Sequence, residues 1–264
     1  MNPNSLAQLA NDAMKEQLAA TPKPGLVDQE SSGAHLDLDY PLMIDAIDAL
    51  TPHLVTFGQT GLFTADQADD KVSDIMQKVG IAALEEVREV SQGANALKGT
   101  TFCLGLFITA YYRVFRRLSG EVTVGELIDQ IARLAAPIKR EKDSHGSFVA
   151  ESYHVEGALG EAQAGYRQWL TEGLWLYRHM QGEHREVRLL LYIMARLDDS
   201  CVYHRVGGGL AEDVKTIANH LYEHFNIEDV RTACRYFERC HISTGGCGDI
   251  LTLVLLADKV LPKE

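Results

Sequence analysis

Long hydrophobic runs are missing from this sequence. The longest, Leu189–Ala195 and Ile250–Ala257, fall far short of the roughly 20 apolar residues that a membrane-spanning helix requires. The N-terminal segment has no apolar stretch of the signal-peptide type either. These absences predict a cytoplasmic protein with no membrane partner.

Cysteine pairs and strand signals are also lacking. The five cysteines are odd in number and contain no C-x-x-C pair, so neither a disulfide framework nor a structural zinc site is expected. No Asn-Gly or Asp-Gly hairpin dipeptide occurs, and period-two alternation of apolar residues is rare. These absences favour a fold without β-sheet, kept in a reducing compartment.

Most of the chain instead repeats its apolar residues at helical spacing. The pattern predicts an all-α fold of roughly ten helices, forming a single compact domain over residues 1–264. No linker or internal repeat divides it. The clearest helices are expected over residues 5–20, 64–90, 98–118, 124–142, 185–197 and 246–260, with another beginning at Asn226.

Positive charge is in deficit, because the formal net charge is −12. This balance argues against nucleic acid as a partner, since the phosphate backbone attracts basic proteins. A small anionic ligand stays compatible with the charge. Its site would need local cations or a divalent metal ion to offset the acidic surroundings.

Polar segments rich in glycine, histidine, aspartate and lysine separate the predicted helices. The first, TPKPGLVDQESSGAHLDL at residues 21–38, contains Lys23, Asp28, His35 and Asp37. A His-x-Asp pair can supply two metal ligands, or an imidazole oriented for acid–base work. The alternative is an ordinary interhelical loop in which Asp37 or Asp39 caps the next helix.

Two helix starts are candidate phosphate sites. Residues 95–101, NALKGTT, enter a predicted buried helix, where amide groups and a lysine suit phosphate oxygens. A plain helix cap with a solvated lysine is the alternative. Residues 243–249, STGGCGD, could direct backbone N–H groups at an anion, with Asp249 turned toward a metal. No lysine follows, so this is not a Walker A loop.

Two further polar segments contain acids. Asp198 and Asp199 follow the apolar stretch 185–197, where negative charge opposes the helix dipole, so Arg205 or a metal ion is expected to compensate them. Residues 207–209 are three glycines and predict a mobile or closely approached turn. Glu161 begins a helix rich in glycine and alanine, which helix packing explains equally well.

Five segments, in this order, resemble the motif set of the triphosphoribosyl-dephospho-CoA synthase family. They are TPKPGLVDQESSGAHLDL, GANALKGTTFCLGL, EGALGEAQAGY, DSCVYHRVGG and STGGCGDILTLVLLAD, so the resemblance runs from about residue 5 to about residue 260. It implies an all-helical transferase that moves the 5′-triphosphoribosyl group of ATP to the 2′-hydroxyl of 3′-dephospho-CoA and releases adenine. The product would be the prosthetic-group precursor of a citrate lyase or malonate decarboxylase acyl carrier protein, attached by a separate transferase.

The chain departs from the family pattern at particular positions. Leu97 and Leu159 stand where the family usually has histidine and arginine, and the last loop reads STGGCGD where S-P-G-G-S-A-D is common. Losing a histidine and an arginine would weaken phosphate binding or change the substrate.

The resemblance also implies roles for individual residues. The implied reaction displaces adenine from the ribose of ATP, and it needs a base for the attacking hydroxyl, an acid near the purine and negative charge near the ribose. His35 is expected to be the acid or base, with Asp28 or Asp199 supporting the ribose or acting as base. Mg²⁺ is expected on Asp37 and Asp249, with Glu161 as a third candidate ligand. The residues expected to bind nucleotide and phosphate are Lys23, Asn95, Lys98, Gly99, His204, Arg205, Ser243, Gly245 and Gly246.

Two rival functions stay open at this point. One is a helical, metal-dependent nucleotide phosphohydrolase, which would release phosphate rather than adenine. The other is a non-catalytic protein that binds nucleotides without turnover. Apolar stripes on so many helices would permit a homodimer without requiring one.

Overall fold

The computed structural model describes residues 1–142 and 144–263, and these residues form helices and no β-strand. The all-α prediction is therefore confirmed. The helices of the described chain are α1 (Pro3–Ala19), α2 (Tyr40–Phe63), α3 (Asp69–Val90), α4 (Lys98–Arg117), α5 (Val124–Ala135), α6 (His145–Tyr153), α7 (Gly157–Gln163), the π-helical η1 (Trp169–Gly173), α8 (Leu174–His179), α9 (Arg185–Met194), α10 (Ser200–Glu223), α11 (Ile227–Arg239) and α12 (Gly245–Val260).

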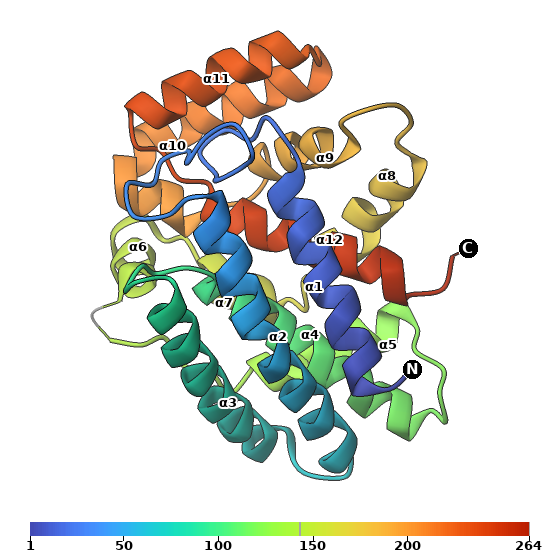
Figure 1. The fold of residues 1–264 in the computed structure, drawn as a ribbon. Helices are drawn as coiled ribbons and strands as arrows, with labels where there is room; N and C mark the ends of the chain where they lie inside the picture. Colours follow the sequence, from blue (N-terminus) through green and yellow to red (C-terminus); the bar gives the residue numbers. More distant parts are fainter. Residues whose placement is uncertain (143, 264) are drawn as a thin grey trace.

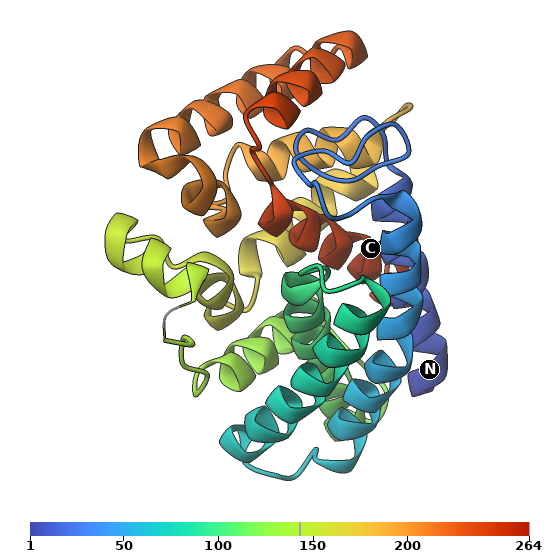
Figure 2. The same ribbon diagram turned by 60° about the vertical axis from the view of Figure 1, so that its left-hand side comes forward.

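Helix α12 runs through the middle of the molecule, as both views show (Figures 1 and 2). It packs against α1, α4, α8, α9 and α10, and residues Ile250–Ala257 are all buried. An almost uninterrupted apolar sequence suits such a place, because no face of the helix meets water. Helices α10 and α11 lie together at one end of the molecule, and α3 lies toward the other (Figure 1).

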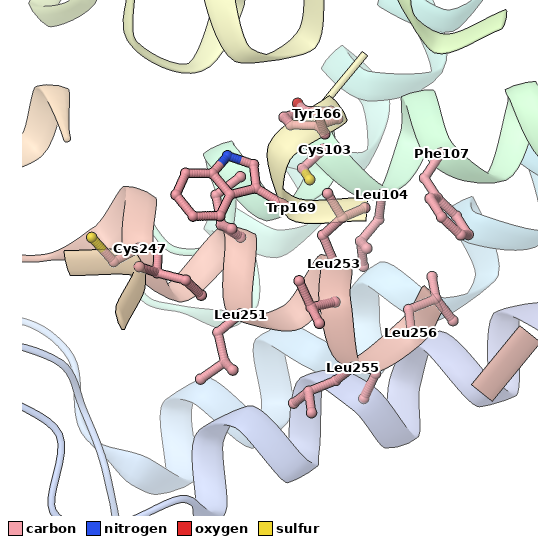
Figure 3. Close-up of a cluster of buried hydrophobic side chains, with 14 of the residues drawn as sticks. Cys103, Leu104, Phe107, Tyr166, Trp169, Cys247, Leu251, Leu253, Leu255 and Leu256 are labelled. Atoms are coloured by element: carbon pink, nitrogen blue, oxygen red, sulfur yellow. The ribbon is translucent and has the colours of Figure 1, made fainter. Parts of the chain in front are cut away.

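Side chains of α12 and α4 form much of the core around this central helix. In the close-up, Leu253 of α12 lies beside Leu104 of α4, near Phe107, whereas Leu251 and Leu255 point to the opposite side of α12 (Figure 3). All of these side chains are at most 1% exposed. Within the part of the chain that the structure describes, no helix is both long and apolar enough to cross a bilayer.

Some helix boundaries differ from the sequence expectations. The helix predicted over residues 64–90 begins at Asp69 as α3, and not at Thr64. Thr64 instead caps the end of α2, where its hydroxyl donates to the Thr60 carbonyl. Helix α5 ends at Ala135 rather than near residue 142, because Pro137 follows and has no N–H to continue the helix.

Two other segments were anticipated incompletely. No expected range covers α2, although Asp39, one of the two acids considered as caps, does cap it by accepting from the Leu42 N–H. The glycines at 207–209 lie inside α10 instead of forming a separate turn. Only Gly207 leaves helical geometry there, with φ of 77°, so the glycines produce a kink.

The central position of α12 predicts a large effect of truncating one of its buried side chains. Leu253→Ala should lower the free energy of unfolding by about 2–5 kcal/mol, because the vacated space cannot be refilled fully. Leu210, which is 45% exposed on α10, is the matched control, and Leu210→Ala should change stability little. Chemical denaturation measures both, and equal losses would contradict the central packing of α12.

Candidate active site

A cavity of about 950 Å³ lies between the loop at residues 20–39 and the N-terminal ends of α4, α10 and α12. Residues 138–142 and 144–146 and the first residues of α7 complete its wall. Of the residues predicted to form a site, the cavity brings together His35, Asp37, Asn95, Lys98, Gly99, His204, Arg205, Ser243, Gly245, Gly246 and Asp249. Segments more than 200 residues apart in sequence therefore meet at one place.

Three long helices present their first turns to this cavity. Lys98–Thr100 of α4, Ser200 and Cys201 of α10, and Gly245 and Gly246 of α12 all line it. The first N–H groups of a helix have no partner within the helix, and the helix dipole adds positive potential at this end. Those N–H groups that have no acceptor in the protein can therefore attract an anion, although the net charge of the chain is −12.

The carboxylate of Asp199 joins two of these helix starts. One oxygen accepts the Cys201 N–H of α10 at 2.8 Å, and the other accepts the Cys247 N–H of α12 at 3.0 Å. Burial raises the pKa of Asp199, and the backbone N–H groups partly offset that effect. Asp199 is 4% exposed and does not line the main cavity, so its observed task is to hold α10 against α12.

Asp198, the acid next to Asp199, is paired with a different cation from the Arg205 that the sequence predicts. Helix α9 ends at Met194, so the two acids precede α10 instead of closing a helix. Asp198 pairs with Lys215 of α10, not with Arg205, and it also accepts a hydrogen bond from the Tyr203 hydroxyl at 3.3 Å. Arg205 is thereby left to line the cavity.

A second carboxylate attaches α12 to α4. The hydroxyl of Thr100 donates to Asp249 at 2.6 Å, while Gly99 allows the other carboxylate oxygen to approach the helix. A Cβ added to Gly99 would lie 1.8 Å from that oxygen. Burial raises the pKa of Asp249 to about 7, Asp199 adds to the effect, and the Thr100 bond opposes it. Asp249 can therefore change its protonation state near neutral pH.

Glu161 lies behind the main cavity. It accepts a hydrogen bond from the Trp169 indole at 2.7 Å, and burial raises the pKa of its carboxyl. With Asp199 and Asp249 it lines a second, much smaller cavity of about 30 Å³. The expected ligand Glu161 is thus separated from Asp37, which is on the main cavity.

The carboxylates present are compatible with Mg²⁺ only if a substrate supplies further ligands. Among residues 1–142 and 144–263, no three or more His, Cys, Asp or Glu side chains are arranged to hold a metal ion. Mg²⁺ is commonly bound through one or two carboxylates together with phosphate oxygens and water. Asp249 fits that pattern, because a cation beside it would favour the ionised form that burial disfavours.

The loop that carries His35 is fixed against the segment before α12. Thr244 donates its hydroxyl to the Pro24 carbonyl at 2.7 Å. Gly25 has φ of 79°, and a Cβ there would lie 2.3 Å from the Ile242 carbonyl oxygen. Glycine is therefore required for the loop to reach the start of α12.

Lys23 and Asp28 organise this loop and do not line the cavity. The Lys23 ammonium donates to the Leu18 carbonyl at 3.2 Å and to the Gln17 carbonyl, so it caps the end of α1. Asp28 accepts the Lys23 backbone N–H at 2.8 Å. Burial lowers the pKa of Lys23 to about 7, with Asp28 opposing the change. The structure gives both residues a part in shaping the cavity wall and no direct contact with its contents.

His35 faces the cavity from this loop. One ring nitrogen is 3.4 Å from the Ser243 hydroxyl, and the other is 3.8 Å from the Asp37 carboxylate. Burial and the nearby Arg205 lower the pKa of His35, and Asp37 opposes them. The imidazole is therefore mostly neutral at neutral pH and can accept a proton.

A basic segment on the cavity wall is not among the residues predicted from the sequence. Lys139, Arg140 and Lys142 line the cavity, and with Lys98 and Arg205 they place five basic side chains around it. Two of the five have acidic partners on the wall, since Lys98 pairs with Glu141 at 3.4 Å and Arg140 pairs with Glu156. The run IKREK in an acidic chain was the available signal, but it was read as the end of a helix.

An all-helical protein with this carboxylate-containing cavity lined by basic side chains can bind a phosphorylated small molecule. The sequence matches the model of the ATP:dephospho-CoA triphosphoribosyl transferase family over residues 3–263. The chain belongs to this family and is an enzyme of the transferase class. Leu97 and Leu159, two of the departures from the family pattern noted above, line the cavity.

Relatives cover almost the entire chain. Two proteins of Streptococcus pyogenes, from serotypes M1 and M2, are each named probable 2-(5''-triphosphoribosyl)-3'-dephosphocoenzyme-A synthase. They are 27% and 28% identical to this chain, and each alignment covers 94% of this chain and 94% of the relative. No solved structure matches the chain.

The raised pKa of Asp249 predicts a pH-dependent gain of stability in Asp249→Asn. The folded-state pKa of about 7 lies above the ordinary value of 3.8, so ionisation destabilises the folded protein as pH rises through this window. Asparagine can still accept from Thr100 but cannot ionise. The gain in melting temperature should therefore be larger at about pH 8 than at about pH 4.

Asp37→Asn is the matched control for this measurement. The Asp37 side chain is 63% exposed, so its replacement should produce no such pH-dependent stabilisation. An Asp249→Asn variant that gains the same stability at both pH values would show that the Asp249 carboxyl is not raised in pKa.

The contact between Gly99 and Asp249 predicts a loss of activity in Gly99→Ala. The added methyl group must displace the Asp249 carboxylate or the start of α4, and displacements of about 1 Å at a reacting centre can reduce turnover by about 10²-fold. Gly125→Ala in α5, where an added Cβ meets nothing within 4 Å, should retain wild-type turnover. Wild-type turnover in Gly99→Ala would show that the placement of Asp249 is unimportant.

Proposed function

We propose that this enzyme transfers the 5′-triphosphoribosyl group of ATP to the 2′-hydroxyl of 3′-dephospho-CoA and releases adenine. The supporting observation is a single cavity in which helix starts and basic side chains attract phosphate, while the Asp249 carboxylate occupies the same wall. The family is described by the same two substrates, ATP and dephospho-CoA, and the Streptococcus relatives are named for the triphosphoribosyl-dephospho-CoA product.

The proposed reaction is a displacement at the anomeric carbon of the ATP ribose. The bond from this carbon to adenine breaks as the bond to the acceptor oxygen forms, and the triphosphate remains intact. Glycosyl transfer of this kind develops positive charge on the ribose ring, which a carboxylate stabilises. We assign this stabilisation to Asp249.

Proton removal from the acceptor hydroxyl is assigned to His35. Its lowered pKa keeps the imidazole in the neutral form that a general base requires. Asp37 and Ser243 lie near opposite ring nitrogens and would orient the ring. The released adenine needs one proton, which balances the proton that His35 takes from the hydroxyl, and solvent water can carry it between them.

The triphosphate is the part of ATP that the cavity can hold most firmly. Lys98 and the amide group at Gly99 would bind its oxygens, with Asn95 adding an amide donor. The Gly246 N–H, which the sequence also predicted for phosphate, is turned to Asp199. Mg²⁺ held by Asp37 together with the phosphate oxygens would neutralise phosphate charge, which leaves the Asp249 carboxylate free for the ribose. Leu97 and Leu159 remove two polar groups of the family pattern, and the basic segment 139–142 offers compensating charge.

We also propose a place for the product. It would be the prosthetic-group precursor for the acyl carrier protein of a citrate lyase or malonate decarboxylase, loaded by a separate transferase in the cytoplasm. This part rests on the five motif segments that the chain shares with the family.

Chromatography of a complete reaction tests the proposal. The purified protein is incubated with ATP, Mg²⁺ and 3′-dephospho-CoA, and free adenine should appear only when all three are present. Phosphate without adenine would overturn the proposal in favour of a phosphohydrolase. ATP binding without any product would overturn it in favour of a non-catalytic protein.

The role of His35 predicts a defect in turnover. His35→Ala should reduce kcat by about 10²–10⁴-fold, the usual contribution of a general base. His224, an exposed residue at the end of α10, provides the control variant His224→Ala, which should keep wild-type kcat. Unchanged turnover in His35→Ala would remove His35 from the reaction.

A further inference from the structure

Two histidines form an exposed stack on the cavity wall. The rings of His145, at the start of α6, and His204, in the first turns of α10, have centroids 3.7 Å apart and planes inclined by 17°. Both residues line the cavity. Neither histidine takes part in the proton removal or the ribose stabilisation proposed above.

Phe148 adds a third ring, which packs edge-to-face against His204. Its centroid is 6.1 Å from that of His204, and the two planes are nearly perpendicular, at 86°. Phe148 is 53% exposed, although a phenyl ring would normally be buried. Tyr153 meets its edge at a centroid distance of 6.4 Å. The result is an aromatic surface beside a phosphate-attracting cavity.

Exposed aromatic faces of this kind suit a nucleobase. Bases stack on aromatic side chains with about 1–3 kcal/mol of stabilisation for each base. Burial, His145 and Arg205 all lower the pKa of His204, so its ring is mostly neutral at neutral pH and offers a π-face without an added charge. Arg205 follows directly in sequence and lines the cavity, where it can bind a diphosphate.

We propose that His145, His204 and Phe148 form a stacking platform for the adenine of 3′-dephospho-CoA. The identity of this ligand rests on the function proposed above. The acceptor keeps its adenine throughout the reaction, whereas the adenine of ATP must leave. A stack that holds a base without protonating it therefore suits the acceptor.

The neighbours of the platform fit the rest of the acceptor. Arg205 would bind the 5′-diphosphate, which lies on the other side of the acceptor ribose from the reacting hydroxyl. Arg205 is also close enough to His35 to lower its pKa. An acceptor bound through His204 and Arg205 would thus bring its ribose toward the proposed base.

Calorimetric titrations test the platform without requiring turnover. 3′-Dephospho-CoA and ATP with Mg²⁺ are titrated separately into wild type, His204→Ala, His204→Phe and Phe148→Ala. His204→Ala should weaken 3′-dephospho-CoA binding by about 5–100-fold, the effect of losing one stacking contact. Phe148→Ala should weaken it in the same direction, His204→Phe should retain it, and ATP binding should change less than about twofold in each.

Matched controls exist in the chain and in the ligand. Trp175 and His179 form another exposed stack, with centroids 4.3 Å apart, on α8 and outside the cavity lining. Trp175→Ala should leave both affinities unchanged. The fragment 4′-phosphopantetheine shares the acceptor's arm but has no base, and its affinity should be equal in wild type and His204→Ala.

Several results would overturn the platform. These are unchanged 3′-dephospho-CoA affinity in both alanine variants, weakening of ATP instead, equal weakening of 4′-phosphopantetheine, or no acceptor binding by wild type. The proposal of the platform and the proposal of the reaction can be overturned independently. Acceptor binding that depends on His204, in a protein that releases no adenine, would support the platform and overturn the reaction.

Discussion

The bridge that Asp199 makes between the starts of α10 and α12 supports the rest of the site. Its carboxylate accepts one backbone N–H from each helix, which aims both N-terminal ends at the same space. Asp249 then ties α12 to α4 through Thr100 and the close approach at Gly99. Two carboxyl groups with raised pKa values in one small region oppose folding stability, as is typical of catalytic sites.

This arrangement explains how a strongly acidic protein can use two polyanionic substrates. Helix dipoles and backbone N–H groups supply positive potential without adding charged residues. The basic segment 139–142, with Lys98 and Arg205, adds charged side chains to the wall. In the proposals made above, phosphate attraction and the reacting carboxylate occupy different parts of this cavity, and the aromatic platform continues from its wall at His145 and His204.

Sequence reasoning recovers the parts of this site that are encoded locally. Apolar periodicity predicts α4 and α12 almost to the residue, and the polar segments containing His35 and Asp249 do meet in space. Lys23 was placed among the phosphate-binding groups because charge in a loop gives no sign of burial; its partners are the carbonyls that end α1. The pairing of Asp198 with Lys215 also depends on how α10 folds back, which no short motif specifies.

The central claim is that ribose and triphosphate move together from ATP to the acceptor. Mass spectrometry of the acceptor after reaction with ATP that carries ¹³C in its ribose tests this claim most directly. The account predicts a single adduct of 3′-dephospho-CoA that contains the labelled ribose and all three phosphates. Unmodified acceptor, with the labelled ribose still joined to adenine in a shorter nucleotide, would contradict it.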